Sequence, residues 1–186
     1  MRYIQGTIVL PLILSIEKSA NINFYVDTEF AVCKDTRSHT DGLITTVKGG
    51  DYIQLRKKLN TKSSTEAELV WVNYVLTQVI WNQSLLNEKG YKIHENVIYQ
   101  YNQIAIKLEN IGIQSSRKRT RHTSIRYYFI IDRVTMQEVS VELCPTLDMI
   151  GDYFKKAMKG SQLCHFCNTI LGIHQDDIPS HNASGG

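Results

Sequence analysis

Acidic side chains follow a predicted strand and begin a predicted helix, an order that suits metal-dependent hydrolysis of phosphodiesters. Asp27 closes the alternating apolar run that starts at Ile22, and Glu66 and Glu68 follow the serines that open a helical pattern. Two-metal hydrolysis needs several carboxylates, because one cation generates the nucleophile and the other stabilises the leaving oxygen. Hard oxygen ligands suit Mg²⁺ or Mn²⁺. These acids therefore predict a metal site.

The helical pattern distinguishes the two glutamates. Glu68 lies within about 40° of Val72 on a helical wheel and shares the side that faces the core, whereas Glu66 lies about 120° away. A carboxylate on the inward side of a first turn costs stability unless something pairs with it. We therefore predict that Glu68 is a ligand and that Glu66 is a first-turn acid favoured by the helix dipole.

Asp148 and Asp152 are a further pair of candidate acids near the C-terminus. They stand four residues apart, about one helical turn, within residues 145–158, which we predict to be helical. Periodicity does not decide which of the two would face a metal ion. A solvated helix face would carry the same two acids, so their role stays open at this point.

The elements that must position these acids follow from the apolar periodicity. The chain has 186 residues and a hydrophobic content of 42%, which suits one globular domain. Predicted strands cover residues 22–27, 43–47, 52–55, 96–100 and 139–143, and predicted helices cover residues 63–89, 103–108, 125–131, 145–158 and 162–171. The Asp41-Gly42 and Gly49-Gly50 pairs mark turns around the second strand of an antiparallel meander. This order predicts an α/β fold in which helices pack on a mixed sheet.

A cluster of cations lies between two of the predicted helices. The segment Arg117-Lys118-Arg119-Thr120-Arg121-His122 carries four permanent positive charges within five residues, although the net charge of the chain is only +3. Such a patch suits a phosphate-bearing partner. A solvated surface loop is the alternative that charge alone leaves open.

The cysteines and the N-terminal apolar run support a different hypothesis. The four cysteines are spaced too unevenly for a disulfide framework, which favours a reducing compartment. Cys164 and Cys167 have the spacing of half a zinc site, but no second pair of this kind exists in the sequence. Residues 8–16 have the outline of a secretory signal or of a strand, and they are too few to span a bilayer. A secreted protein with a zinc knuckle is the alternative that these features leave open.

Seven short segments, in this order, resemble the ribonuclease H domain of copia-type retrotransposon polyproteins. The matching segments lie within residues 2–7, 25–27, 37–40, 62–69, 102–106, 119–129 and 152–157. Each segment is weak alone, but seven in a fixed order are specific. The resemblance covers nearly the whole chain.

The resemblance implies a fold, a substrate and a set of site residues. The fold is ribonuclease H-like, with a mixed five-stranded sheet of three antiparallel strands and then parallel strands. The activity is two-metal cleavage of the RNA strand of RNA–DNA hybrids with Mg²⁺ or Mn²⁺, without a small-molecule substrate or a membrane. The implied catalytic metal ligands are Asp27, Glu68 and Asp152, and only the resemblance selects Asp152 over Asp148. The implied nucleic-acid-binding residues are Arg117, Lys118, Arg119, Arg121, His122 and Arg126.

Tyr101 departs from the family pattern, which has an aspartate before Asn102 and Gln103. A tyrosine brings a neutral phenol and a bulky ring where a charged ligand is expected. Loss of a partner of a metal ligand typically costs about 10–100-fold in activity, and loss of a ligand itself should cost more. We therefore expect an impaired ribonuclease H, and the alternative is a non-catalytic nucleic-acid-binding remnant. Asp41, Ser124 and Lys155 are further departures from the pattern.

The resemblance also predicts a domain organisation and a setting. Residues 1–20 would end a reverse transcriptase or connection region, residues 21–160 would form the ribonuclease H-like domain, and residues 161–186 would form a C-terminal helix and a frayed tail. The reverse transcriptase region of the same polyprotein is the expected protein partner. The expected location is intracellular, in the cytoplasm or in a retrotransposon particle, and not secreted.

Overall fold

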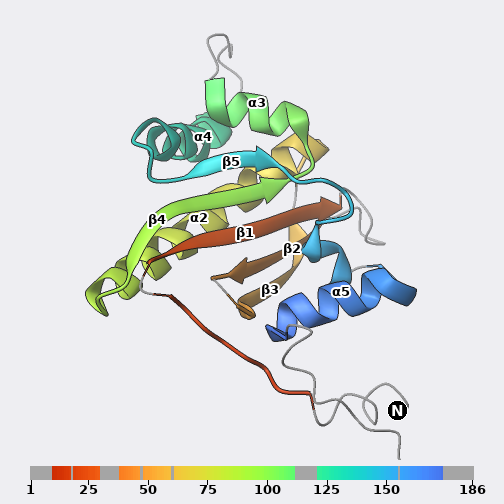
Figure 1. Ribbon diagram of the computed structural model, residues 1–186. Coiled ribbons are helices and arrows are strands. Elements are labelled where there is room, and N and C mark those ends of the chain that lie inside the picture. The colour runs from red at the N-terminus through yellow and green to blue at the C-terminus, as the bar shows by residue number, and fades with distance from the viewer. Residues whose placement is uncertain are drawn as a thin grey trace, which may run out of the picture.

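The structure, a computed structural model, describes residues 10–17, 19–29, 38–46, 48–59, 61–111, 121–154 and 156–173 (Figure 1). Its elements are β1 (Ser19–Glu29), β2 (Ser38–Thr45), β3 (Gly50–Leu59), α2 (Ser64–Glu88), β4 (Lys92–Gln100), α3 (Gln103–Ile111), α4 (Arg121–Thr135), β5 (Ser140–Leu143), the 3₁₀ helix η1 (Ile150–Phe154) and α5 (Gly160–Leu171). Among the described helices, none is both long enough and apolar enough to cross a bilayer.

The strands of the described residues form one five-stranded mixed sheet in the order β3-β2-β1-β4-β5. The strand β2 runs antiparallel to both β1 and β3, whereas β4 runs parallel to β1 and to β5. Parallel neighbours need a long crossover, which α2 supplies before β4 and which α3 and α4 supply before β5 (Figure 1). The predicted α/β architecture, with helices on a mixed sheet, is confirmed.

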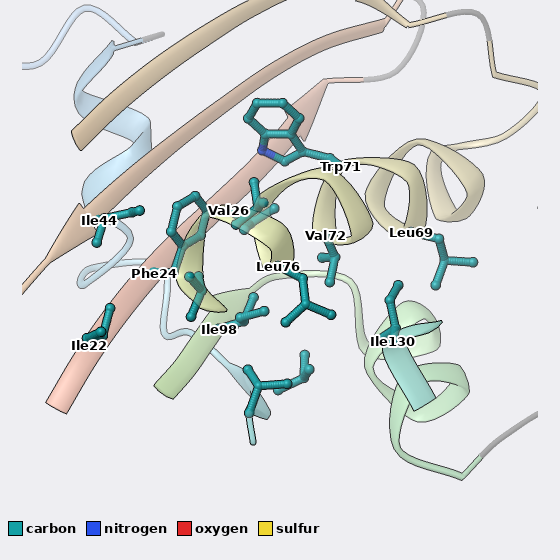
Figure 2. Packing of buried hydrophobic residues seen from close by; sticks show 14 of the residues in the cluster. Ile22, Phe24, Val26, Ile44, Leu69, Trp71, Val72, Leu76, Ile98 and Ile130 are labelled. Atoms are coloured by element: carbon teal, nitrogen blue, oxygen red, sulfur yellow. The ribbon is translucent and has the colours of Figure 1, made fainter. Parts of the chain in front are cut away.

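The main core lies between the sheet and α2. Ile22, Phe24 and Val26 alternate along β1, and all three are fully buried (Figure 2). The helix covers them with a stripe at three- and four-residue spacing, and the buried members of this stripe are Leu69, Val72, Val75, Leu76 and Val79. The period of two along the strand and the period of 3.6 along the helix explain why both elements were predictable.

The ends of α2 are set by local hydrogen bonds. The hydroxyl of Ser63 accepts a bond of 3.1 Å from the backbone N–H of Glu66, and the Glu66 carboxylate accepts one of 2.7 Å from the backbone N–H of Lys62. The first bond satisfies a backbone donor that the first helical turn leaves unpaired, and the second pairs a donor just before the helix. After the helix, Gly90 adopts a left-handed φ of +87°, which glycine tolerates best. The predicted helix over residues 63–89 is confirmed.

A predicted turn at Asp41 and Gly42 is wrong, because both residues lie inside β2. The pair has the composition of a turn, but its glycine serves close packing instead. A Cβ atom built on Gly42 would lie 2.7 Å from Cζ of Phe24, closer than such contacts allow. The strand therefore requires glycine at the point where the Phe24 ring crosses it.

The predicted helix over residues 145–158 is also wrong. In the described residues of this stretch, regular structure is limited to the short η1, which follows a turn in which the Asp148 N–H donates to the Pro145 carbonyl over 3.0 Å. Met149 and Ile150 are buried, and Ile150 packs in one apolar cluster with Leu43 of β2. The segment turns inward to pack against β1 and β2, so tertiary contacts override the local helical pattern.

The second face of the sheet is covered by η1 and α5. Leu43, Ile150, Phe166 and Ile170 form a separate apolar cluster there. Leu43 and Ile44 are neighbours in β2 and belong to different clusters, because successive strand residues point to opposite faces. The predicted helix over residues 162–171 is confirmed as α5, which begins two residues earlier. The sheet therefore separates two layers, and the candidate acids Asp27 and Asp152 lie on the side of the second layer, whereas Glu68 belongs to α2 in the first.

Candidate functional site

Asp27 lies near the C-terminal end of β1 and is 7% exposed. Alternation places its side chain on the same face as Tyr25 and opposite to Val26, which packs toward α2. The antiparallel register puts Asp41 of β2 directly across from it. On this face η1 packs closely against the strand, since a Cβ atom on Gly151 would lie 3.5 Å from Cβ of Asp27.

Asp152 is held in η1 by two donors that reach the same carboxylate oxygen. Its side chain is buried, with an exposed fraction of 2%. The Tyr101 hydroxyl donates to Oδ2 over 2.9 Å, and the Lys156 ammonium lies 2.7 Å from the same atom. The Lys156 ammonium also stands 5.9 Å from the centre of the Tyr101 ring. Asp152, Tyr101 and Lys156 therefore form one polar cluster, which we call the Asp152 cluster.

The electrostatics of the Asp152 cluster favour a charged carboxylate beside a neutral phenol. Burial raises the pKa of the Asp152 carboxyl, whereas the hydrogen bond from Lys156 lowers it. Hydrogen bonding with Asp27 and Tyr101 lowers it further, so that the pKa of Asp152 falls below its ordinary value. Burial, the hydrogen bond with Asp152 and the nearby negative charges raise the pKa of the Tyr101 phenol. Tyr101 is thus a neutral hydrogen-bond donor at neutral pH.

Tyr101 is positioned by the junction between β4 and α3. The strand ends at Gln100, and the Asn102 side chain caps α3 by accepting hydrogen bonds of 3.1 Å from the backbone N–H groups of Ile104 and Ala105. Such caps fix the first turn of a helix. The parallel register of β4 with β1 brings the Tyr99 ring to 5.1 Å from the Tyr25 ring. Tyr101 follows two residues later, near the end of β1 that carries Asp27.

Glu68 lies at the start of the second turn of α2 and is 5% exposed. Its inward direction agrees with the helical wheel, and Glu66 instead caps the helix. Asp148 is exposed and Asp152 is buried, which distinguishes two acids that periodicity left equivalent. The structure brings Asp27 and Asp152 together. Among the described residues, however, it places no group of three or more Asp, Glu, His or Cys side chains where they could hold a metal ion.

The acids of this site have the ligand type, but not the arrangement, that the divalent cations implied by the resemblance require. Carboxylate oxygens from Asp27, Glu68 and Asp152 are the ligand type that Mg²⁺ and Mn²⁺ prefer. Yet Oδ2 of Asp152 already accepts a phenol and an ammonium, and the described acids do not converge as a group. In this arrangement the residues do not fit a two-metal centre.

Two residues of this site were not predicted as members of it. Asp41 is fully buried across from Asp27, and its backbone carbonyl accepts a 2.9 Å hydrogen bond from Nε1 of Trp71. The turn-like pair with Gly42 concealed its place in a strand. Lys156 follows Asp152 by four residues, a spacing typical of helical ion pairs. That spacing was the signal that could have identified Lys156 as a partner.

The predicted nucleic-acid-binding residues lie mostly outside the described parts of the chain. Arg117, Lys118 and Arg119 fall outside the described residues, and Arg121 and His122 lie in the first turn of α4 with side chains outside the description. Arg126 is described, and its side chain is exposed on α4. The assignment of these six residues to nucleic acid stays a prediction.

Comparison with known proteins finds related sequences in transposons. The chain is 28% identical over 155 residues to the Pol polyprotein from transposon TNT 1-94 of Nicotiana tabacum, which covers 82% of this chain and 11% of that protein. It is 28% identical over 173 residues to the Pol polyprotein from transposon RE1 of Arabidopsis thaliana, with 91% and 12% covered. The chain therefore spans 11–12% of the length of these relatives. No protein-family model matches it.

Comparison with solved structures identifies the fold. LC11-RNase H1, isolated from compost by a metagenomic approach, matches with a TM-score of 0.50 at 13% identity and covers 68% of this chain and 85% of its own. The N-terminal RNase H domain of Rv2228c from Mycobacterium tuberculosis matches with a TM-score of 0.50 at 8% identity and covers 72% and 88%. At these identities the likeness concerns the fold alone.

Proposed function

We propose that this chain, a homologue of a segment of transposon Pol polyproteins with a ribonuclease H fold, is an impaired ribonuclease H domain. Its ancestral reaction is endonucleolytic hydrolysis of the RNA strand of RNA–DNA hybrids by two-metal catalysis. The observation that carries the proposal is the 2.9 Å hydrogen bond from the Tyr101 hydroxyl to Asp152. The aromatic side chain occupies the place of a missing carboxylate and binds a carboxylate that should serve a metal ion.

The loss of activity has an electrostatic and a steric cause. Asp27, Glu68 and Asp152 supply hard oxygen atoms for Mg²⁺ or Mn²⁺, but the neutral Tyr101 phenol adds no negative charge. Its hydrogen bond and the Lys156 ammonium compete directly for Oδ2 of Asp152. A cation would have to displace both donors and would meet the positive charge of the lysine. Weak binding of divalent cations, and hence slow cleavage, is the expected result.

The expected partners follow from the same assignment. An RNA–DNA hybrid would be bound through its backbone, with Arg126 and the segment 117–122 supplying positive charge. Ribonucleases of this kind read the shape of the hybrid more than its bases. The reverse transcriptase region of the same polyprotein is the proposed neighbour in the chain, with residues 1–20 as its end. The setting would be intracellular, in the cytoplasm or a retrotransposon particle.

A paired cleavage assay tests the proposal. The purified chain and its Tyr101→Asp variant are incubated with a labelled RNA–DNA hybrid and Mg²⁺ or Mn²⁺. We expect the variant to cleave at least about 10–100-fold faster, because it regains a carboxylate and releases Asp152. Adding Asp27→Asn to Tyr101→Asp should abolish the gained activity. Tyr101→Phe is the matched control, since it removes the hydroxyl but restores no charge.

The outcomes separate the proposal from its alternative. Equal cleavage by the chain and by Tyr101→Asp would contradict the role given to Tyr101. No cleavage by either, together with binding that weakens as salt rises, would favour a non-catalytic nucleic-acid-binding remnant. This alternative is favoured because the fold is retained although the side chains of the site already bind one another where a metal ion would bind.

A further inference from the structure

We infer that Lys156 is the built-in counter-ion of Asp27 and Asp152, so that this acidic pair is held without a divalent cation. The inference rests on the proposed function, which identifies the pair as the remains of a metal site. Under the proposed function Lys156 only competes with a metal ion for Asp152. The inference gives Lys156 a further role, which is to hold the acidic pair in place.

Two buried carboxylates side by side need a compensating positive charge. Asp27 is 7% exposed and Asp152 is 2% exposed, so water screens neither of them well. The hydrogen bond between the two carboxyl groups holds one proton, so the pair keeps one negative charge, which burial makes costly unless a positive charge lies nearby. In a metal centre the cations would supply the compensation. Here the Lys156 ammonium, at 2.7 Å from Oδ2 of Asp152, supplies a positive charge.

The backbone places Lys156 for this contact. Its N–H donates to the Asp152 carbonyl over 2.9 Å, which is the hydrogen bond of a helical turn. Residues four apart on such a turn have neighbouring side chains. The lysine side chain is 52% exposed, so its aliphatic stem runs along the surface while its ammonium reaches the edge of the buried acid.

Tyr101 also stabilises the Lys156 ammonium. Its hydroxyl donates to the same oxygen, and its ring centre lies 5.9 Å from the Lys156 ammonium. A cation over an aromatic face is attracted by the ring quadrupole. An aspartate at position 101 would lack both the ring and the donor hydroxyl. Tyr101 therefore has two effects in the Asp152 cluster. It replaces a carboxylate that could bind a metal ion, and it stabilises the Lys156 ammonium.

The expected consequence is a fold whose stability does not depend on divalent cations until Lys156 is removed. Thermal unfolding of the full chain is measured in EDTA and in millimolar Mg²⁺ for the chain, Lys156→Met and Lys156→Arg. Lys107→Met is the matched control, because Lys107 is an exposed lysine of α3. Mn²⁺ binding is measured on the same proteins by electron paramagnetic resonance.

The melting temperature of the original chain should be the same in EDTA and in Mg²⁺. Lys156→Met should melt roughly 2–6 °C lower in EDTA, recover at least half of that shift in Mg²⁺, and bind Mn²⁺ more tightly. Lys156→Arg and Lys107→Met should follow the original chain. Equal Mg²⁺ stabilisation of the chain and Lys156→Met, or no loss in Lys156→Met, would overturn the inference.

If Lys156→Met does not fold, the original chain decides the question. Mn²⁺ binding to it that Mg²⁺ displaces, and that Asp152→Asn removes, would overturn the inference. Absence of such binding would support it. These readouts do not use cleavage, so failure of Tyr101→Asp to cleave a hybrid would refute the proposed function while the counter-ion role stood on its own measurements.

Discussion

Two buried acids, Asp152 in η1 and Glu109 in α3, have opposite electrostatic environments. Asp152 accepts hydrogen bonds from a lysine ammonium and a phenol. Glu109 is fully buried and accepts a hydrogen bond from the neutral side-chain amide of Gln100. The pKa of Asp152 is lowered in spite of its burial, whereas burial raises the pKa of Glu109 to about 8. The same functional group is therefore charged in one region and neutral in the other at physiological pH.

The comparison shows that burial alone does not identify a functional acid. A carboxyl group in an apolar region takes up a proton unless a cation or several donors stabilise its charge. Among the described residues Glu109 has one donor, which is neutral, and the Tyr127 phenol of α4 has a pKa raised to about 12 by burial and by the Glu109 charge. Glu109 belongs to the packing between β4, α3 and α4. Asp152 instead belongs to the candidate site, because its carboxylate lies beside Asp27 and the Lys156 ammonium.

The largest expected effect is a pH dependence of stability that comes from Glu109. Its pKa in the folded chain is about 8, above the ordinary value of 4.5. Its contribution to stability is therefore complete below about pH 4.5 and is lost as the pH rises through about 8. We expect the free energy of unfolding to fall by on the order of 3–5 kcal/mol across this interval. Urea unfolding at a series of pH values measures it.

Glu109→Gln separates this effect from other titrations. The amide cannot ionise, so the variant should become more stable than the original chain toward pH 8 and should lose the slope. Glu142→Gln, at an exposed position of β5, should keep the original profile. A difference between the original chain and Glu109→Gln that does not change with pH would show that Glu109 is not neutral in the fold.

Truncation of the two acids should give the second largest effect on the free energy of unfolding. Glu109→Ala removes a buried side chain and leaves the Gln100 amide without its acceptor, which should cost about 2–4 kcal/mol near pH 6. Asp152→Ala should cost about 1–2 kcal/mol, because it removes the hydrogen bonds from Tyr101 and Lys156, whereas the half-exposed Lys156 returns to water. Denaturant unfolding of both variants measures the two costs. A larger cost for Asp152→Ala would reverse the assignment of structural and functional acids.

The smallest expected effect is that of removing one hydroxyl from the Asp152 cluster. Tyr101→Phe loses a hydrogen bond to a charged group at a partly buried position, which should lower the free energy of unfolding by about 1 kcal/mol. Tyr128→Phe is the control, because Tyr128 is 62% exposed on α4 and its change should stay within about 0.5 kcal/mol. Equal effects of the two substitutions would contradict the hydrogen bond to Asp152.

The fold was predictable where burial is periodic. Phe24 and Val26 of β1 and the stripe of α2 repeat at intervals that only a strand or a helix produces. The two errors, at Gly42 and at residues 145–158, have a common cause. In both places a contact with another strand decides the conformation, and local composition carries no information about that contact. The 3₁₀ turn of η1 follows from packing against β1 rather than from its own residues.

The sequence indicated several acids of the candidate site but not the contacts between them. The direction of Glu68 followed from the wheel, and Asp152 was selected by the resemblance. The hydrogen bond between Tyr101 and Asp152 joins residues separated by 51 positions, and no periodicity reports such a contact. The burial of Glu109 was missed for a similar reason, because its donor Gln100 lies on a different element.

The cap of α3 by Asn102 has a genetic consequence. Because the helix start is secured by the residue after Tyr101, a change of side chain at position 101 leaves the path of the backbone intact. Tyrosine and aspartate codons differ at a single base. A lineage carrying this chain is therefore one point mutation from the carboxylate that the family pattern contains, on a scaffold that would not have to be rebuilt to receive it.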